Sequence, residues 1–329
     1  MAKLNCLGIE TTAHTFGASV VDSSGRVLSN IIDSYKTKKG GIVPVQAADH
    51  HVEVCREVVA KALSTANKSI KDINLISFSQ GPGIGHCLRI GAVMARALSI
   101  TNKIPIIGVN HPVAHLEIGK LRTGAKDPVM LYASGANTQV IALEGGRYRV
   151  MGETLDNGVG NFIDGFAREL GLGFPGGPKI EELALKGKKY VELPYSVKGM
   201  DVSFGGLQTN LKDKIKSGRH SKEDLCFSVQ ETVFAMLLEV SERAMAHADK
   251  KELLLGGGVG CNKRLQEMAD KMCKARGASF FVPENQFLID NAAMIAWLGI
   301  LEHKTGRKQS IKDTQIRPYW RVDEVEVLY

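Results

Sequence analysis

Apolar and polar positions in the first third of the chain follow two periods. Short, strongly apolar runs separated by tight turns are typical of β-strands. Farther along, Val52, Cys55, Val59 and Leu63 recur every three or four positions, which indicates one face of an α-helix. The predicted strands are 4–10, 17–22, 26–32, 73–79 and 104–109, and the predicted helices are 46–63, one from the glycine-rich turn at 80–85 to 98, and one opening at 110.

The second half repeats this order. Each half has the pattern β-β-β-α-β-α, and the second carries an insertion at about 155–222. A duplicated unit predicts an α/β protein with two similar lobes, 1–125 and 126–329, around a cleft where ligands gather at the carboxyl ends of the strands. This is the arrangement of the actin–Hsp70–sugar-kinase (ASKHA) superfold. The predicted strands are 129–133, 138–143, 148–153, 252–255 and 278–282, and the predicted helices are 161–170, 178–187, 223–247, 263–276 and 290–302.

Length and composition agree with two globular domains. The chain has 329 residues, of which 44% are hydrophobic and 23% are charged. No apolar run reaches the roughly 18 residues that a membrane helix needs, and the N-terminus lacks the pattern of a signal peptide. Six scattered cysteines form no C-x-x-C pair, so we expect reduced thiols in a cytoplasmic protein without a membrane partner.

The formal net charge of +7 is a modest basic excess. Lysine and arginine gather in clusters such as 186–189 and 212–219. Solvated helix faces explain most clusters of this kind, and a polyanionic partner such as RNA is the functional alternative.

A histidine pair is the most specific chemical signal. Asn110 follows an apolar strand and suits an N-cap, and Pro112 is tolerated in a first helical turn. His111 and His115 would then lie one turn apart on the same helix face, where two imidazoles can share a metal ion. Packing or capping at a helix start is the commoner reason for such a pair.

Tyr132 and Asp290 also lie at a strand end or at the start of the next helix. A two-lobed α/β fold brings such positions to the cleft. Without a ligand role, Tyr132 is a core residue and Asp290 is the N-cap of the last helix. Together with two imidazoles, a phenolate and a carboxylate suit iron, with zinc as the alternative.

Small residues and hydroxyls follow the first strand of each half. The turns Glu10-Thr11-Thr12 and 134–138 can bring backbone N–H groups to a phosphate, and 256–262 is a glycine-rich strand-to-helix turn. Ordinary turns are the alternative for each. In the insertion, Asp164 and Glu181 flank Gly176-Gly177, which suits a ribose diol unless both carboxylates simply face water.

Three classes of function are open at this point. The histidine spacing matches H-E-x-x-H, but Pro112 stands where a metalloprotease needs its general-base glutamate, so proteolysis is disfavoured. An ATP-dependent phosphotransferase or ATPase of the superfold would bind ATP in the cleft and would not need the histidine pair. A non-catalytic scaffold or nucleic-acid-binding module is the third class.

Seven motifs in this order resemble one family, the tRNA threonylcarbamoyladenosine transferases of the archaeal and eukaryotic KEOPS type, once labelled O-sialoglycoprotein endopeptidases. The similarity extends from residue 7 to the tail at 323–327. One such motif alone is weak, but seven in order are highly specific. The motifs are residues 8–17, 80–83, 110–115, 132–139, 152–156, 257–259 and 290–294.

The resemblance implies transfer of a threonylcarbamoyl group from threonylcarbamoyl-AMP to the exocyclic amine of the adenosine 3′ to the anticodon in ANN-decoding tRNAs. It implies a nucleotide in the cleft and one metal ion, iron or zinc, on His111, His115, Tyr132 and Asp290. The implied partners are tRNA and the KEOPS subunits, namely a small dimerising subunit and a protein-kinase-like ATPase subunit that some archaea fuse after this domain. The implied donor contacts are Tyr132, Ala133, Ser134, Gly135, Ala136, Asp164, Gly177, Glu181 and Asn262.

Several positions depart from the family pattern. His86 replaces a usual proline, Gly165 a usual lysine, and Leu288-Ile289 a usual Cys-Thr. Ala136 stands where the family usually has glycine. Its methyl group lies where the turn is expected to approach the donor, and a residue with a Cβ resists positive φ.

Overall fold

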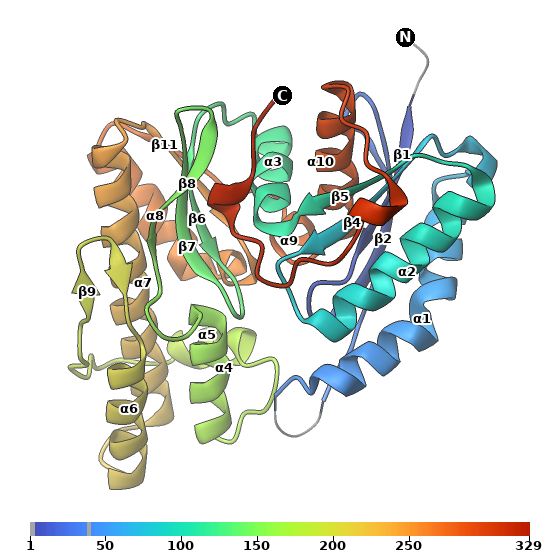
Figure 1. The fold of residues 1–329 in the computed structure, drawn as a ribbon. Coiled ribbons are helices and arrows are strands. Elements are labelled where there is room, and N and C mark those ends of the chain that lie inside the picture. The colour runs from blue at the N-terminus through green and yellow to red at the C-terminus, as the bar shows by residue number, and fades with distance from the viewer. Residues whose placement is uncertain (1–3, 38–40) are drawn as a thin grey trace.

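The duplicated α/β fold is confirmed by two mixed five-stranded sheets in a computed structural model (Figure 1). The structure describes residues 4–37 and 41–329. Residues 1–3 and 38–40, which belong to the predicted first lobe, lie outside the described residues. Within the described parts of the chain, no helix is long and apolar enough to cross a membrane.

The first sheet has the strand order β3-β2-β1-β4-β5. Its first three strands form an antiparallel meander, and β4 and β5 add in parallel, as crossover helices require. Because all residues of β1, β2, β4 and β5 are buried, this sheet is covered on both faces. The elements are β1 (Asn5–Glu10), β2 (Thr15–Asp22), β3 (Val27–Ser34), α1 (Pro44–Thr65), β4 (Leu75–Gly81), α2 (Gly85–Asn102) and β5 (Ile106–Asn110).

The second sheet repeats the first in the order β12-β11-β6-β7-β8. Its meander is β6 to β8, and β11 and β12 add in parallel to β6. The two sheets therefore share one topology, as the repeated pattern predicted. The elements are β6 (Val129–Ala133), β7 (Thr138–Glu144), β8 (Arg147–Glu153), α7 (Lys222–His247), β11 (Glu252–Gly256), α8 (Lys263–Ala275) and β12 (Ser279–Phe281).

Two helices, α3 (His111–Thr123) and α10 (Ala292–Lys304), lie between the sheets (Figure 1). They pack against each other, and α10 also contacts β1, β2 and β4 of the first sheet. The contact with β1 depends on Gly8, because a Cβ there would lie 2.2 Å from the carbonyl oxygen of Ala292. The last helix of the chain is thus built into the first sheet.

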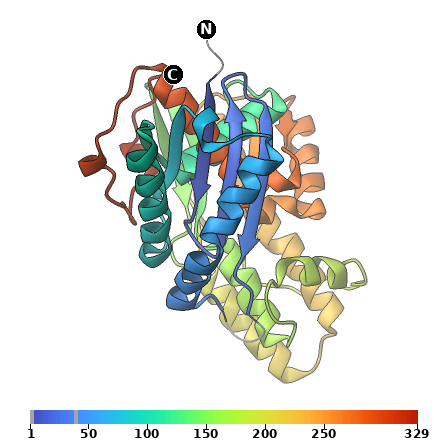
Figure 2. The same cartoon turned by 90° about the vertical axis from the view of Figure 1, so that its right-hand side faces the viewer.

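The insertion extends away from the two sheets (Figure 2), and α7 connects it to the second sheet by packing against β6 and β7. Helix α6 was not predicted, because it opens on Gly205-Gly206 and buries only Leu207 and Leu211. The predicted apolar face of α1 is also wrong in part, since Val52 is 56% exposed. The elements here are α4 (Val159–Glu169), α5 (Gly177–Ala184), β9 (Val197–Lys198), β10 (Asp201–Val202) and α6 (Gly205–Ser217), and the short α9 (Asn285–Leu288) precedes α10.

The tail after α10 contacts both sheets (Figure 1). It first follows the β4–β5 edge, where the Arg317 N–H donates to the Gln80 carbonyl at 2.7 Å. It ends on the second sheet, where Glu326 pairs with Arg147 of β8. The short 3-10 turns Ile311–Asp313 and Val322–Glu324 lie within it.

Candidate metal site and adjoining cavity

The two histidines lie side by side at the start of α3, between the sheets. The Asn110 side chain accepts the Val113 N–H at 3.2 Å, which confirms the predicted N-cap. One helical turn separates His111 from His115, and their ring centroids are 4.8 Å apart. Both side chains are buried. The local sequence therefore presents two imidazoles on one helix face.

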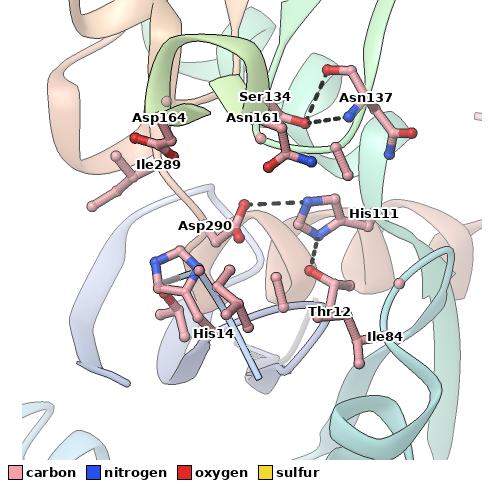
Figure 3. Close-up of a pocket in the computed structure, with 18 of the residues that line it drawn as sticks. Thr12, His14, Ile84, His111, Ser134, Asn137, Asn161, Asp164, Ile289 and Asp290 are labelled. Carbon is pink, nitrogen blue, oxygen red and sulfur yellow. Dashed lines mark hydrogen bonds and ion pairs between the residues drawn. The ribbon is translucent and has the colours of Figure 1, made fainter. Parts of the chain in front are cut away.

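Asp290 reaches this pair from the connection between α9 and α10 (Figure 3). Its Oδ1 lies 3.3 Å from His111 Nε2 and 3.5 Å from His115 Nε2. One ligand atom from each of the three residues can be chosen so that all lie within 4.8 Å of one another. The alternative N-cap role of Asp290 is wrong, because Asn291 caps α10 by accepting the Met294 N–H at 3.1 Å.

Tyr132 lies near the end of β6 beside the three residues. Its ring centroid is 5.2 Å from that of His115 and 6.4 Å from that of His111. The side chain is buried, and burial raises the pKa of its hydroxyl. The structure thus brings all four predicted ligand residues to one place, and an ion there would meet nitrogen and oxygen donors together.

The buried polar atoms of this cluster fit a metal ion. Neither ring nitrogen of His115 has a hydrogen-bond partner among the described residues, although both are buried. Leaving a buried polar group without a partner costs about 1–3 kcal/mol, and coordination would remove that cost. Burial would raise the pKa of Asp290, but the neighbouring rings of His111 and His115 hold it well below its usual value. The carboxylate is therefore charged and ready to bind a cation.

Glu10 supports the site from the end of β1. His111 Nδ1 lies 3.0 Å from Glu10 Oε2 and 3.2 Å from the Thr12 hydroxyl, so His111 Nε2 is the nitrogen that faces Asp290. The Glu10 carboxylate also accepts the Thr12 N–H at 2.6 Å. Of the predicted phosphate turn Glu10-Thr11-Thr12, only Thr12 lines the cavity. Thr11 is buried, and its N–H donates to the Ser79 hydroxyl.

A cavity of about 820 Å³ opens above these residues and is walled by both halves of the chain (Figure 3). The first half contributes the β1–β2 turn and the turn after β4, and the second contributes the turn after β6 and the start of α4. His111, Tyr132 and Asp290 form part of its lining. Sequence reasoning did not single out the lining residues His14, Pro82, Gly83, Ile84, Asn161, Arg168, Phe174, Gln208 and Pro318 as site residues.

The turn after β6 is held in a tight, rigid form. The Ser134 N–H donates to the Asn137 carbonyl at 2.9 Å, and the Gly160 N–H donates to the Ser134 carbonyl at 3.0 Å. A Cβ at Gly160 would lie 2.7 Å from the Gly135 Cα, so only glycine allows this approach. Ala136 is not among the non-glycine residues with positive φ, so its methyl group causes no backbone strain.

Asp164 also lines the cavity, from α4. Its Oδ1 accepts the Gly176 N–H at 2.7 Å, and burial raises the pKa of its carboxyl. The predicted carboxylate beside the Gly176-Gly177 turn is therefore in place. His14, from the opposite wall, packs edge-on against Phe174 of the same insertion, with ring centroids 5.9 Å apart.

The remaining predicted donor contacts, Ala133, Gly177, Glu181 and Asn262, do not line this cavity. The last two meet at the start of α8, where Glu181 Oε1 accepts the Lys263 N–H at 2.7 Å. Asn262 caps α8 through the Arg264 and Leu265 N–H groups, and its amide donates to Gln230 at 2.7 Å. Both side chains thus already have structural partners.

Comparison with known proteins gives one consistent family. The family profile TsaD, described as tRNA N6-adenosine threonylcarbamoyltransferase, matches residues 26–297. A tRNA N6-adenosine threonylcarbamoyltransferase of Thermococcus kodakarensis is 55% identical over 98% of this chain and 99% of its own length. A probable bifunctional tRNA threonylcarbamoyladenosine biosynthesis protein of Methanocaldococcus jannaschii is 53% identical over 98% of this chain but only 60% of its own length.

Solved structures share the fold at low sequence identity. HypF of T. kodakarensis superposes with a TM-score of 0.64 at 14% identity, over 91% of this chain and 47% of HypF. Component A of the (R)-2-hydroxyglutaryl-CoA dehydratase of Acidaminococcus fermentans superposes with a TM-score of 0.60 at 13% identity, over 92% of this chain and all of that one. At these identities the likeness concerns the fold alone.

Proposed function

This chain belongs to the tRNA N6-adenosine threonylcarbamoyltransferase family, and we propose that it transfers the threonylcarbamoyl group of threonylcarbamoyl-AMP to the exocyclic amine of the adenosine 3′ to the tRNA anticodon. The observation that carries this proposal is the convergence of His111, His115 and Asp290 beside the cavity, whose wall includes His111 and Asp290. A phosphotransferase of the same superfold would not need these imidazoles. A protease would need a glutamate where Pro112 stands.

The cavity has separate groups for the parts of the donor. Ser134, Gly135 and Ala136 form a compact turn after β6, which suits the phosphate because backbone N–H groups can approach it closely. Asp164 offers a carboxylate oxygen to the ribose hydroxyls. Glu181 and Asn262 would reach the donor only by exchanging their present partners, Lys263 and Gln230.

A metal ion fits the donor set of His111, His115, Tyr132 and Asp290, and iron is our first choice, with zinc second. Such an ion would polarise the carbamoyl oxygen as a Lewis acid. Glu10 fixes the orientation of His111. The exocyclic amine of the adenosine attacks the threonylcarbamoyl group directly, and AMP leaves. No covalent intermediate with the enzyme forms, so the site requires no nucleophilic serine or cysteine.

We further propose that the protein acts in the cytoplasm within a KEOPS complex, with a small dimerising subunit and a protein-kinase-like ATPase subunit. The bifunctional relatives support this proposal. This chain spans only about 60% of their length, so each of them carries a further segment that can hold the second function. The net charge of +7 favours binding to the tRNA backbone.

The proposal is tested by a transfer assay with purified tRNA, synthetic threonylcarbamoyl-AMP and the partner subunits. We expect the wild type to modify tRNA. We expect His111→Ala to lose its bound metal, and its transfer rate to fall to a small fraction of the wild-type rate. Metal analysis of the protein as purified is the first measurement. Absence of transfer by the complete wild-type complex would overturn the proposed function, and full activity of a metal-free His111→Ala variant would overturn the role of the metal.

A further inference from the structure

The cavity extends to both sides of the histidine–aspartate cluster. Figure 3 places Asp164, Ser134 and Asn137 on one side of the Asp290–His111 pair, and Thr12 and Ile84 on the other. The proposed ribose contact, Asp164, belongs to the first side. The side at Ile84 carries none of the proposed donor contacts and is left for the second substrate, the adenosine of the tRNA.

The tail of the chain forms part of the wall on this second side. Pro318 lines the cavity together with the turn that follows β4. Backbone hydrogen bonds fix it there, since the Gly83 N–H donates to the Pro318 carbonyl at 3.1 Å. The space for a side chain at Gly81 is also filled, because a Cβ there would lie 1.9 Å from the carbonyl oxygen of Arg317. The wall is thus a rigid junction between the tail and the first sheet.

Tyr319 follows Pro318 and is 92% exposed, the largest fraction among the exposed large hydrophobic residues of the described chain. Its neighbours are held firmly. Trp320 is buried under the Arg317 guanidinium, which lies 4.2 Å from the indole ring, and the Trp320 N–H donates to the Arg317 carbonyl. A fixed backbone therefore presents a bare aromatic ring next to a residue of the cavity wall.

We propose that Tyr319 stacks on the nucleobase that adjoins the acceptor adenosine in the tRNA anticodon loop. This inference rests on the proposed function. An adenosine can enter the cavity only by leaving its neighbours in the loop, and the adjoining base then remains at the entrance without its stacking partner. Because Tyr319 directly follows the lining residue Pro318 and its ring is exposed, the ring is available to restore the lost stacking, and it can do so for any base because every base has a π-face.

An exposed arginine on the helix that adjoins Pro318 fits an RNA strand. Pro318 packs toward Gly85 at the start of α2, and Arg89 lies on the next turn of that helix. Arg89 is exposed and forms no ion pair with the described residues, so its charge is available to a phosphate. An acidic protein partner would use the same charge but would have no need of a flat ring, and the test separates the two.

The experiment compares Tyr319→Ala with Tyr319→Phe, which keeps the ring, in the assembled complex. Leu185→Ala is the matched control, because Leu185 is 83% exposed and does not line the cavity. Steady-state transfer gives kcat and the KM values for tRNA and donor. Binding of an anticodon stem-loop that carries 2-aminopurine beside the acceptor adenosine reports stacking directly, because stacking quenches its fluorescence.

We expect Tyr319→Ala to raise the KM for tRNA about tenfold and to abolish the quenching, with the donor KM and complex assembly unchanged. Tyr319→Phe should restore both readouts, and Leu185→Ala should match the wild type. If Tyr319→Ala transfers at the wild-type rate with an unaltered KM for tRNA, this inference is overturned and the proposed function is not affected. Loss of complex assembly in Tyr319→Ala with normal quenching would assign the ring to a protein partner instead. A wild type that neither transfers nor binds the stem-loop would overturn the proposed function as well.

Discussion

Glu10 Oε2 and His111 Nδ1 form a hydrogen bond of 3.0 Å, although the two residues are 101 positions apart in the chain. One residue ends β1 and the other begins α3, so the first strand of the fold orients the first histidine of the cluster. A histidine that ligates a metal usually donates its second ring N–H to a carboxylate, which fixes its tautomer. Glu10 is placed to accept that proton, and its full burial makes the hydrogen bond stronger than it would be in water.

Replacing Glu10 with Gln tests this relationship. The amide keeps the size of the side chain but removes the charge that orients His111, so we expect metal affinity to fall by roughly 10–100-fold. Competition with a chromophoric chelator measures that affinity without any substrate. Glu57→Gln, at an exposed position of α1, is the control and should bind metal like the wild type. Equal affinity in both variants would mean that Glu10 does not position the histidine.

Asp290 and Asn291 are neighbours with separate roles, which gives a second prediction. Asp290→Asn should lose bound metal because the negative oxygen near both imidazoles is gone, while the N-cap of α10 stays in place. Asn291→Ala should instead lower the free energy of unfolding by about 1 kcal/mol, because α10 loses its N-cap. Metal titration and chemical denaturation of the metal-free variants measure both effects. If Asn291→Ala leaves the free energy of unfolding unchanged, the assignment of the cap is wrong.

Local rules explain what the sequence could predict about the site. The N-cap at Asn110 and the spacing of His111 and His115 depend only on helix geometry, and the repeated strand order placed Tyr132 and Asp290 at the same cleft. The partner of His111 could not be predicted in this way. Glu10 was assigned to a phosphate turn because its contact crosses between elements, and no local pattern marks it.

The tail shows the same limit. Pro318 lines the cavity because its carbonyl meets the Gly83 N–H, a contact between positions more than two hundred residues apart. Helix α6 was missed for a different reason. It buries only Leu207 and Leu211 and begins with two glycines, so its helical period is weak and its intrinsic propensity is low. Tertiary packing decides both features.

Gly160→Ala provides a third prediction, on the turn after β6. The added Cβ would lie 2.7 Å from the Gly135 Cα, which must move the turn away from α4. We expect the KM for threonylcarbamoyl-AMP to rise about tenfold or more, with metal content unchanged, because a displacement of about 1 Å can cost this much. Gly206→Ala is the control, since nothing lies within 4 Å of its Cβ position. An unchanged donor KM in Gly160→Ala would separate this turn from donor binding.

Glu302, near the end of α10, gives a prediction on pH and stability. Burial raises the pKa of its carboxyl from the usual 4.5 to about 7, although the Arg307 guanidinium opposes the shift. The folded state therefore holds the proton more tightly than the unfolded chain does. The resulting stabilisation is fully present below about pH 4.5 and is lost as the pH rises through about 7, by an amount on the order of 3 kcal/mol.

Glu302→Gln isolates this contribution, because glutamine has no proton to lose in this range. As the pH rises from 5 to 8, the free energy of unfolding of the wild type should fall relative to that of Glu302→Gln. Urea denaturation of the metal-free proteins at these two pH values measures it, and Glu267→Gln, at an exposed carboxylate, should show no such shift. Arg307 and Tyr329 are the other ionisable groups that interact with Glu302. Burial raises the pKa of Tyr329 well above its usual value, so its hydroxyl keeps its proton across this pH range. A difference that does not change with pH would therefore mean that Glu302 is already ionised in the folded protein.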